Sequence, residues 1–183
     1  MRRIVLTYGL LAGAIVALML VAMIATMRSS DELDIEGGQV YGYASMVLAF
    51  LLVFFGIRRY RDTVGGGAIG FRRALGVGLL ITLVACAVYV VTWEILYYGF
   101  VPDFAERYGA AMVARMRESG ESAAAIAATE ADMARFAEMY RNPLVNVGMT
   151  FLEIFPVGLV MTLISAAILR RRVAGFTPGT APG

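Results

Sequence analysis

Four long apolar runs constrain the fold of this chain more than any other feature of its sequence. A helix needs roughly 18–20 apolar residues to cross a hydrocarbon core of about 30 Å. Because lipid offers the backbone no hydrogen-bond partner, spanning runs of this length are expected to be helical. The sequence therefore predicts an all-α integral membrane protein with transmembrane helices over about residues 4–27, 40–57, 74–101 and 144–169. We expect a single domain over residues 1–172 and a disordered cytoplasmic tail over 173–183.

The first run is expected to be a retained helix rather than a cleaved signal peptide. Its 24 uncharged residues, Ile4 to Met27, exceed the apolar core of a signal peptide, which is usually about 7–15 residues long.

The composition agrees with a chain immersed in lipid. Hydrophobic residues make up 60% of the chain and charged residues 16%, whereas soluble domains average about 45–50% and about 25%. With no histidine and one cysteine, the chain lacks the common metal ligands, the usual general acid–base residue and a disulfide pair. A net charge of +2 gives no electrostatic basis for binding nucleic acid. We expect no enzymatic activity, no metal and no cofactor, and the lipid bilayer as the main partner.

Arginine placement predicts the orientation of the helices. One set of helix ends carries a single acid, Asp62, against ten arginines: Arg2, Arg3, Arg58, Arg59, Arg61, Arg72, Arg73, Arg170, Arg171 and Arg172. The opposite ends carry more acids than arginines. Since arginine-rich loops remain in the cytoplasm, both termini are predicted to be cytoplasmic.

The longest connection, residues 102–142, is predicted to form an amphipathic helical hairpin outside the membrane. Phe104, Tyr108, Met112 and Met116 recur every four residues, which places them on one helical face. After a Ser-Gly-Glu-Ser break at 119–122, where either serine can cap a helix, a second apolar face follows: Ile126, Met133, Phe136 and Tyr140. We favour packing of the two faces against each other; the alternatives are the bilayer surface and a second subunit.

The two shorter connections differ in charge. Residues 28–39 form an outer turn that we interpret as a solvated loop rather than a calcium site, because its acids lack the EF-hand order: Asp31, Glu32, Asp34 and Glu36.

Residues 58–73 form the inner turn, in which five arginines flank three consecutive glycines: Arg58, Arg59, Arg61, Arg72 and Arg73. Their role in orienting the helices across the membrane is enough to explain these arginines. The alternative is that they bind anionic lipid headgroups.

Two acids, Glu94 and Glu153, interrupt the third and fourth runs. At a rise of 1.5 Å per residue both lie roughly 10–14 Å below the outer boundary, so their carboxyl groups can meet between antiparallel helices. Pro156 is expected to kink the last helix and to free a backbone carbonyl beside Glu153. With Trp93, these residues form a candidate polar site within the membrane. We favour a structural hydrogen bond between helices over proton or cation movement.

Gly9 and Gly13 begin a ridge of small residues on the first helix, continued by Ala17. Such a ridge lets another helix approach closely. We expect the partner to be a helix of the same chain, with a second subunit as the alternative.

Several strings resemble one bacterial family. They are Gly-Tyr-Ala-Ser-Met (42–46), Phe-Gly-Ile-Arg-Arg-Tyr-Arg-Asp (55–62), Gly-Leu-Leu-Ile-Thr-Leu (78–83), Met-Tyr-Arg-Asn-Pro-Leu (139–144) and Thr-Phe-Leu-Glu-Ile-Phe-Pro-Val-Gly-Leu (150–159). Over about residues 4–172 the chain resembles the family called domain of unknown function 4199. The resemblance implies a four-helix protein of the bacterial inner (plasma) membrane and no assigned activity. Trp93, Glu94 and Glu153 lie in strings that resemble the family's pattern.

Two functions follow as hypotheses. The one we favour is a non-enzymatic accessory or scaffold protein of the membrane, with self-association as one use of its surfaces. The alternative is an oligomeric small transporter, or a proton- or ion-coupled permeation protein, that uses Glu94 and Glu153. An intramembrane enzyme is disfavoured, because only these two carboxylates could serve as acid and base.

Overall fold

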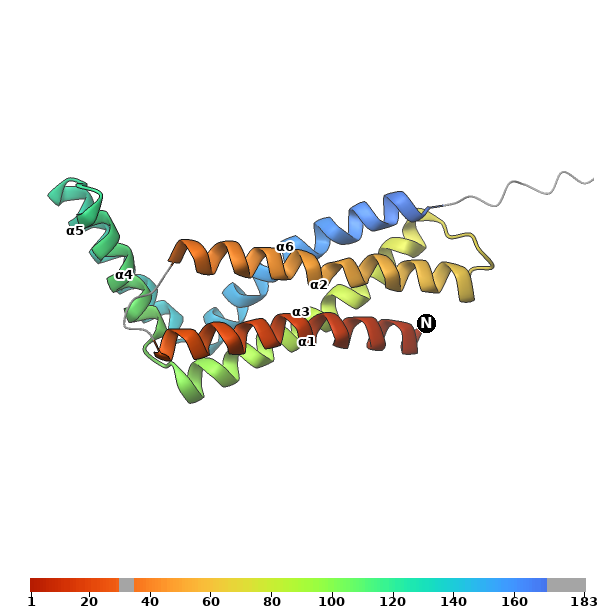
Figure 1. Ribbon diagram of the computed structural model, residues 1–183, viewed down its shortest axis with the longest axis horizontal. Coiled ribbons are helices and arrows are strands. Elements are labelled where there is room, and N and C mark those ends of the chain that lie inside the picture. Colours follow the sequence, from red (N-terminus) through yellow and green to blue (C-terminus); the bar gives the residue numbers. More distant parts are fainter. Residues whose placement is uncertain (30–34, 171–183) are drawn as a thin grey trace, which may run out of the picture.

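The computed structural model describes residues 1–29 and 35–170, and these form an all-helical protein (Figure 1). The helices are α1 (Arg2–Ser29), α2 (Ile35–Thr63), α3 (Phe71–Phe100), α4 (Phe104–Glu118), α5 (Ala123–Tyr140) and α6 (Pro143–Leu169). Segments of α1, α2, α3 and α6 are long and apolar enough to cross a membrane: Arg2–Thr26, Val40–Thr63, Phe71–Phe100 and Pro143–Leu169. The predicted all-α class with four apolar, membrane-spanning helices is confirmed.

The second long helix is longer than its apolar run. We predicted a span over 40–57, whereas α2 continues through the arginines to Thr63. Arginine is a good helix former, so charge alone does not end a helix. The stop comes from the glycines, because Gly66 and Gly67 adopt positive φ angles of 61° and 88°, a backbone region that other residues rarely enter. The inner turn is therefore only residues 64–70.

The order of helices around the bundle differs from their order in the chain. α1 packs on α2 and α3, and α6 packs on the same two helices. Around the bundle the order is therefore α1, α2, α6, α3 (Figure 1). α2 and α3 also meet across the centre, which separates α1 from α6. The core between them is apolar, with Phe50, Ile81 and Ile154 completely buried.

Glycines set the closest helix contacts. A Cβ atom at Gly9 would lie 2.6 Å from Val84 Cβ, and one at Gly13 would lie 2.7 Å from Val88 Cβ. The ridge on α1 thus lies against α3 of the same chain. Gly158 of α6 is tighter still, since its added Cβ would lie 2.4 Å from Thr82 Cγ2 on α3.

The outward surfaces of the long helices are apolar. Leu18, Ile95 and Ile168 are 69%, 61% and 65% exposed in the isolated chain. Exposure of large apolar side chains on this scale suits a hydrocarbon solvent rather than water.

Residues of the longest connection form α4 and α5, which pack against each other beyond the end of the bundle opposite the N-terminus (Figure 1). Gly109 permits the contact, because its added Cβ would lie 3.0 Å from Met133 Cβ. Ser122 begins α5, where its hydroxyl accepts a hydrogen bond from Ala125 N at 3.2 Å. Asn142 begins α6 in the same way, accepting from Leu144 N at 3.0 Å. Both caps stand where the sequence predicted a helix boundary.

Candidate functional site: a polar junction between the hairpin and the bundle

Asn146, in the first turn of α6, is the centre of a buried hydrogen-bond network. Its side chain has no exposed surface. The side-chain oxygen accepts hydrogen bonds from the Trp93 indole N–H at 3.0 Å and from the Thr150 hydroxyl at 3.3 Å. The side-chain amide donates to the main-chain carbonyl of Tyr140 at 3.5 Å. The network therefore ties α3, α5 and α6 together at one point, which we call the polar junction (Trp93, Tyr140, Asn146 and Thr150).

An aromatic cluster surrounds this junction and brings in α4. The Trp93 and Phe104 rings meet edge to face at a centroid distance of 4.9 Å. Tyr97 meets Tyr140 in the same way at 5.4 Å, and Phe136 stacks on Tyr140 at 5.1 Å. Aromatic pairs in these geometries contribute about 0.5–1.5 kcal/mol each beyond the area they bury. The base of the hairpin is thus packed onto the bundle through both helices.

Tyr140 is a neutral member of the junction. Burial raises the pKa of its hydroxyl to about 12, although hydrogen bonds with Thr150 and Trp93 favour the charged form. The phenol therefore keeps its proton at any physiological pH, and the junction involves no charge that the bilayer interface would have to solvate.

Glu153 lies on α6 beyond the junction, and its polar partner is Tyr89 of α3. The buried Tyr89 hydroxyl donates to Glu153 Oε2 at 3.5 Å. The rest of the Glu153 side chain is exposed on the side of the bundle. The arrangement is an interhelical hydrogen bond from a tyrosine to a carboxyl group.

Glu94 has different surroundings. It is half-buried on α3, and its Oε1 atom is buried without a hydrogen-bond partner. The structure therefore does not join the two carboxyl groups in a shared hydrogen bond. Glu94 follows Trp93 in sequence and lies about 100° around α3 from it.

A third polar contact lies deeper, where α3 and α6 are closest. The hydroxyls of Thr82 and Thr162 are 2.9 Å apart, and Thr82 donates to the Gly158 carbonyl at 3.4 Å. Both threonines are completely buried. α6 remains helical through Pro156, which is exposed and takes no part in this contact.

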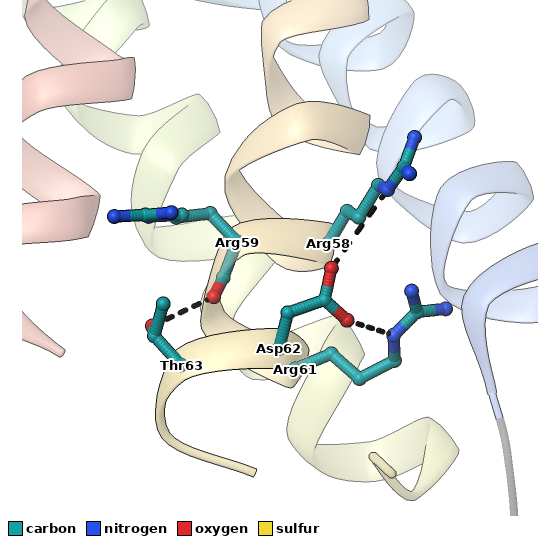
Figure 2. A network of polar contacts seen from close by, with 5 residues as sticks. All are labelled: Arg58, Arg59, Arg61, Asp62 and Thr63. Carbon is teal, nitrogen blue, oxygen red and sulfur yellow. Dashed lines mark hydrogen bonds and ion pairs between the residues drawn. The ribbon is translucent and has the colours of Figure 1, made fainter. Parts of the chain in front are cut away.

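The arginine-rich end of the bundle contains a small charge network (Figure 2). Asp62 lies 2.7 Å from Arg61 Nε and 3.8 Å from Arg58 Nε. The Arg59 side chain extends away from this group (Figure 2), and within residues 1–29 and 35–170 it forms no ion pair. Arg73 instead donates from Nε to the Tyr60 hydroxyl at 3.0 Å. Arg72 is exposed at the start of α3.

Some predictions lie outside the described residues. They are the calcium alternative at Asp31, Glu32 and Asp34, the side chain of Glu36, the arginines Arg171 and Arg172, and the tail 173–183. Within the part of the chain that the structure describes, no three histidine, cysteine or acidic side chains gather to hold a metal ion.

Sequence reasoning found Trp93 and Glu153 but missed their partners, Asn146 and Tyr89, and also Thr150, which donates to Asn146. A signal was present in α6, where polar or small residues recur about every four positions along an otherwise apolar helix: Asn146, Thr150, Gly158, Thr162 and Ser165. Such a stripe is typical of a membrane helix face that packs on another helix. All five are buried here.

Comparison with known protein families gives one match. The family profile described as "Protein of unknown function (DUF4199)" matches residues 7–171. No curated protein matches the chain. No solved structure matches it either.

Proposed function

This chain belongs to the DUF4199 family, and we propose that it is a non-enzymatic accessory protein of the membrane. Its four-helix bundle would serve as an anchor, and the α4–α5 hairpin would be a rigid arm that contacts another protein. The observation that carries this proposal is the polar junction, which fixes the base of the hairpin to two spanning helices.

The hairpin is also braced along its own length. Near its tip, Arg117 at the end of α4 forms an ion pair with Glu130 of α5. At its base, Arg141 lies 3.0 Å from Glu106. The pKa of the Glu106 carboxyl is lowered first by its own backbone N–H and then by Arg141. Because ion pairs join α4 and α5 near the tip and at the base, the hairpin loses little conformational entropy when it binds a partner. This favours a role in recognition.

The charges of the hairpin support contact with water or with a polar partner rather than with lipid. Exposed side chains of both signs cover it: Arg115, Glu118, Asp132, Arg135 and Glu138. We propose that it lies on the extracytoplasmic side of the inner membrane, because the opposite end carries the arginine excess.

Site-specific photo-cross-linking in cells tests the proposed contact. A cross-linker at Met139, which is 54% exposed on α5, should give a discrete protein adduct. The matched control is Ile168, which is 65% exposed on α6 and should meet lipid. If Met139 gives no more protein adduct than Ile168, and the protein is monomeric in nanodiscs, the accessory role is wrong.

A second candidate, proton- or ion-coupled permeation by an oligomer, is favoured by a different observation. Glu94 Oε1 is buried without a partner, and a separate carboxyl, Glu153, is held by Tyr89. Intramembrane acids with incomplete pairing often mark ion pathways. Liposomes with an internal pH dye should then show proton flux that both Glu94→Gln and Glu153→Gln reduce. Equal flux in wild-type and variant liposomes would exclude this role.

A further inference from the structure

The arginine-rich end contains one arginine that a neutral partner holds in place. Arg73 donates from Nε to the hydroxyl of Tyr60 at 3.0 Å, and its guanidinium carbon lies 5.8 Å from the centre of the Tyr60 ring. Tyr60 is only 2% exposed, so it is a fixed support. Among the described residues, neither Nη group of Arg73 has a carboxylate partner. Arg73 is therefore oriented without being neutralised.

The other arginines of this end compete for one acid. Asp62 forms ion pairs with Arg58 and Arg61, as Figure 2 shows. Within residues 1–29 and 35–170, Asp62 is the only acid at this end, against eight arginines: Arg2, Arg3, Arg58, Arg59, Arg61, Arg72, Arg73 and Arg170. Within the described residues, the positive charge of Arg73 is therefore left to pair with an anion such as a ligand.

A cleft lies beside Arg73. It has a volume of about 270 Å³, and its lining includes Tyr60, Val64, Gly65, Gly70 and Arg73. The Tyr60 hydroxyl accepts from Arg73, and within the described residues its own proton has no acceptor. The Arg73 guanidinium and the Tyr60 hydroxyl are therefore two donors at one cleft, and a phosphate oxygen suits both.

The position of the cleft favours a lipid as the source of that phosphate. α2 ends at Thr63 and α3 begins at Phe71, so the cleft lies where the apolar spans end. Val64 at its rim is 53% exposed and can contact an acyl chain. We propose that the Tyr60–Arg73 cleft binds a phosphate group, and that at this depth it is the phosphate of an anionic phospholipid headgroup.

Native mass spectrometry of the detergent-solubilised protein with added phosphatidylglycerol tests the site. Arg73→Gln should reduce the bound fraction by about tenfold, because it removes a charge-assisted hydrogen bond. Tyr60→Phe should give a smaller reduction, since it keeps the ring and loses only the hydroxyl. The matched control is Arg59→Gln, which removes the same charge from the same end but outside the cleft, and should change binding less than about twofold.

Three further measurements decide the interpretation. Fluorescence of Trp93, at the far end of the bundle, should be unchanged in each variant, which shows that the fold is intact. Phosphatidylcholine should bind the wild-type protein weakly. Equal losses for Arg59→Gln and Arg73→Gln, or equal binding of both lipids, would overturn the site. Displacement of the lipid by glycerol 3-phosphate at matching concentration would retain the phosphate site and overturn its lipid source.

Discussion

At the scale of single residues, Asn146 links two spanning helices to each other and to the base of the hairpin. It serves as acceptor for two side chains and as donor to a third group, all within one buried volume. A buried donor that loses its acceptor costs about 1–3 kcal/mol. Substitution of this one side chain therefore tests the whole junction.

Asn146→Ala should lower the free energy of unfolding by about 1–3 kcal/mol, because the Trp93 N–H then has no acceptor. Trp93 is the only tryptophan in the chain, so its emission reports directly on the junction and should shift to longer wavelength. Thermal unfolding in detergent gives the stability. Val147→Ala is the control, since Val147 is 38% exposed and next in sequence. Unchanged emission and stability in Asn146→Ala would contradict the role of the junction.

The Glu106 carboxyl makes the base of the hairpin sensitive to acid. Because its pKa in the folded protein lies below the ordinary value, its contribution to stability is present above the unfolded pKa and is lost as the pH falls through the folded pKa. As the pH falls from about 6 to about 3, the hydrogen-exchange protection factors of α4 should therefore decrease more in the wild-type protein than in Glu106→Gln. An identical pH dependence in both proteins would show that the pair with Arg141 does not stabilise the hairpin.

At the scale of the helices, the contact between α3 and α6 depends on the absence of a side chain at Gly158. Phe50 and Thr82 occupy the space that a Cβ would need, at 2.8 Å and 2.4 Å. Interiors packed this closely tolerate added atoms poorly. The same helix contains a natural control, because a Cβ at Gly148 would meet nothing within 4 Å.

Gly158→Ala should destabilise the protein by about 1–3 kcal/mol through overpacking. Gly148→Ala should be neutral, or should stabilise it by about 0.5–1 kcal/mol, because alanine is the better helix former. Adding Thr82→Ser, which removes the obstructing methyl group, should recover part of the loss. Denaturant titration of the solubilised variants measures all three. Equal stability of the two glycine variants would show that α3 and α6 are not in close contact here.

At the scale of the whole molecule, the arginine distribution predicts one side of the membrane for both termini and the other for the hairpin. In a Cys86→Ala background, a cysteine at Ser119 should react with a membrane-impermeant maleimide in intact cells. A cysteine at Gly66 should react only after the membrane is permeabilised. Both positions are exposed in the structure, so accessibility within the fold does not bias the comparison. The reverse pattern would invert the proposed orientation.

Much of the fold was predictable because its signals are local. Apolar length fixed the four spans, and Ser122 and Asn142–Pro143 marked helix starts with side chains that cap them. The inner turn begins later than predicted, because arginine does not stop a helix, whereas the positive φ angles of Gly66 and Gly67 do. The order of helices around the bundle is set by tertiary packing, which no single segment encodes.

The candidate site was only partly predictable, and the reason is geometric. Rise per residue gives the depth of Glu94 and Glu153, but the direction in which a side chain points depends on how each helix is rotated in the bundle. That rotation brings Tyr89 to Glu153. The sequence shows the polar stripe of α6, but not that Trp93 and Thr82 of α3 would be its partners.

The place of α6 between α2 and α3 has a consequence for biogenesis. It follows α3 in the chain and supplies the polar partners of Thr82, Tyr89 and Trp93. A polypeptide truncated before Pro143 would present those polar groups to hydrocarbon, and membrane proteases that survey unassembled helices would have a defect to recognise. We therefore expect a chain truncated before α6 to be degraded faster than one that contains it.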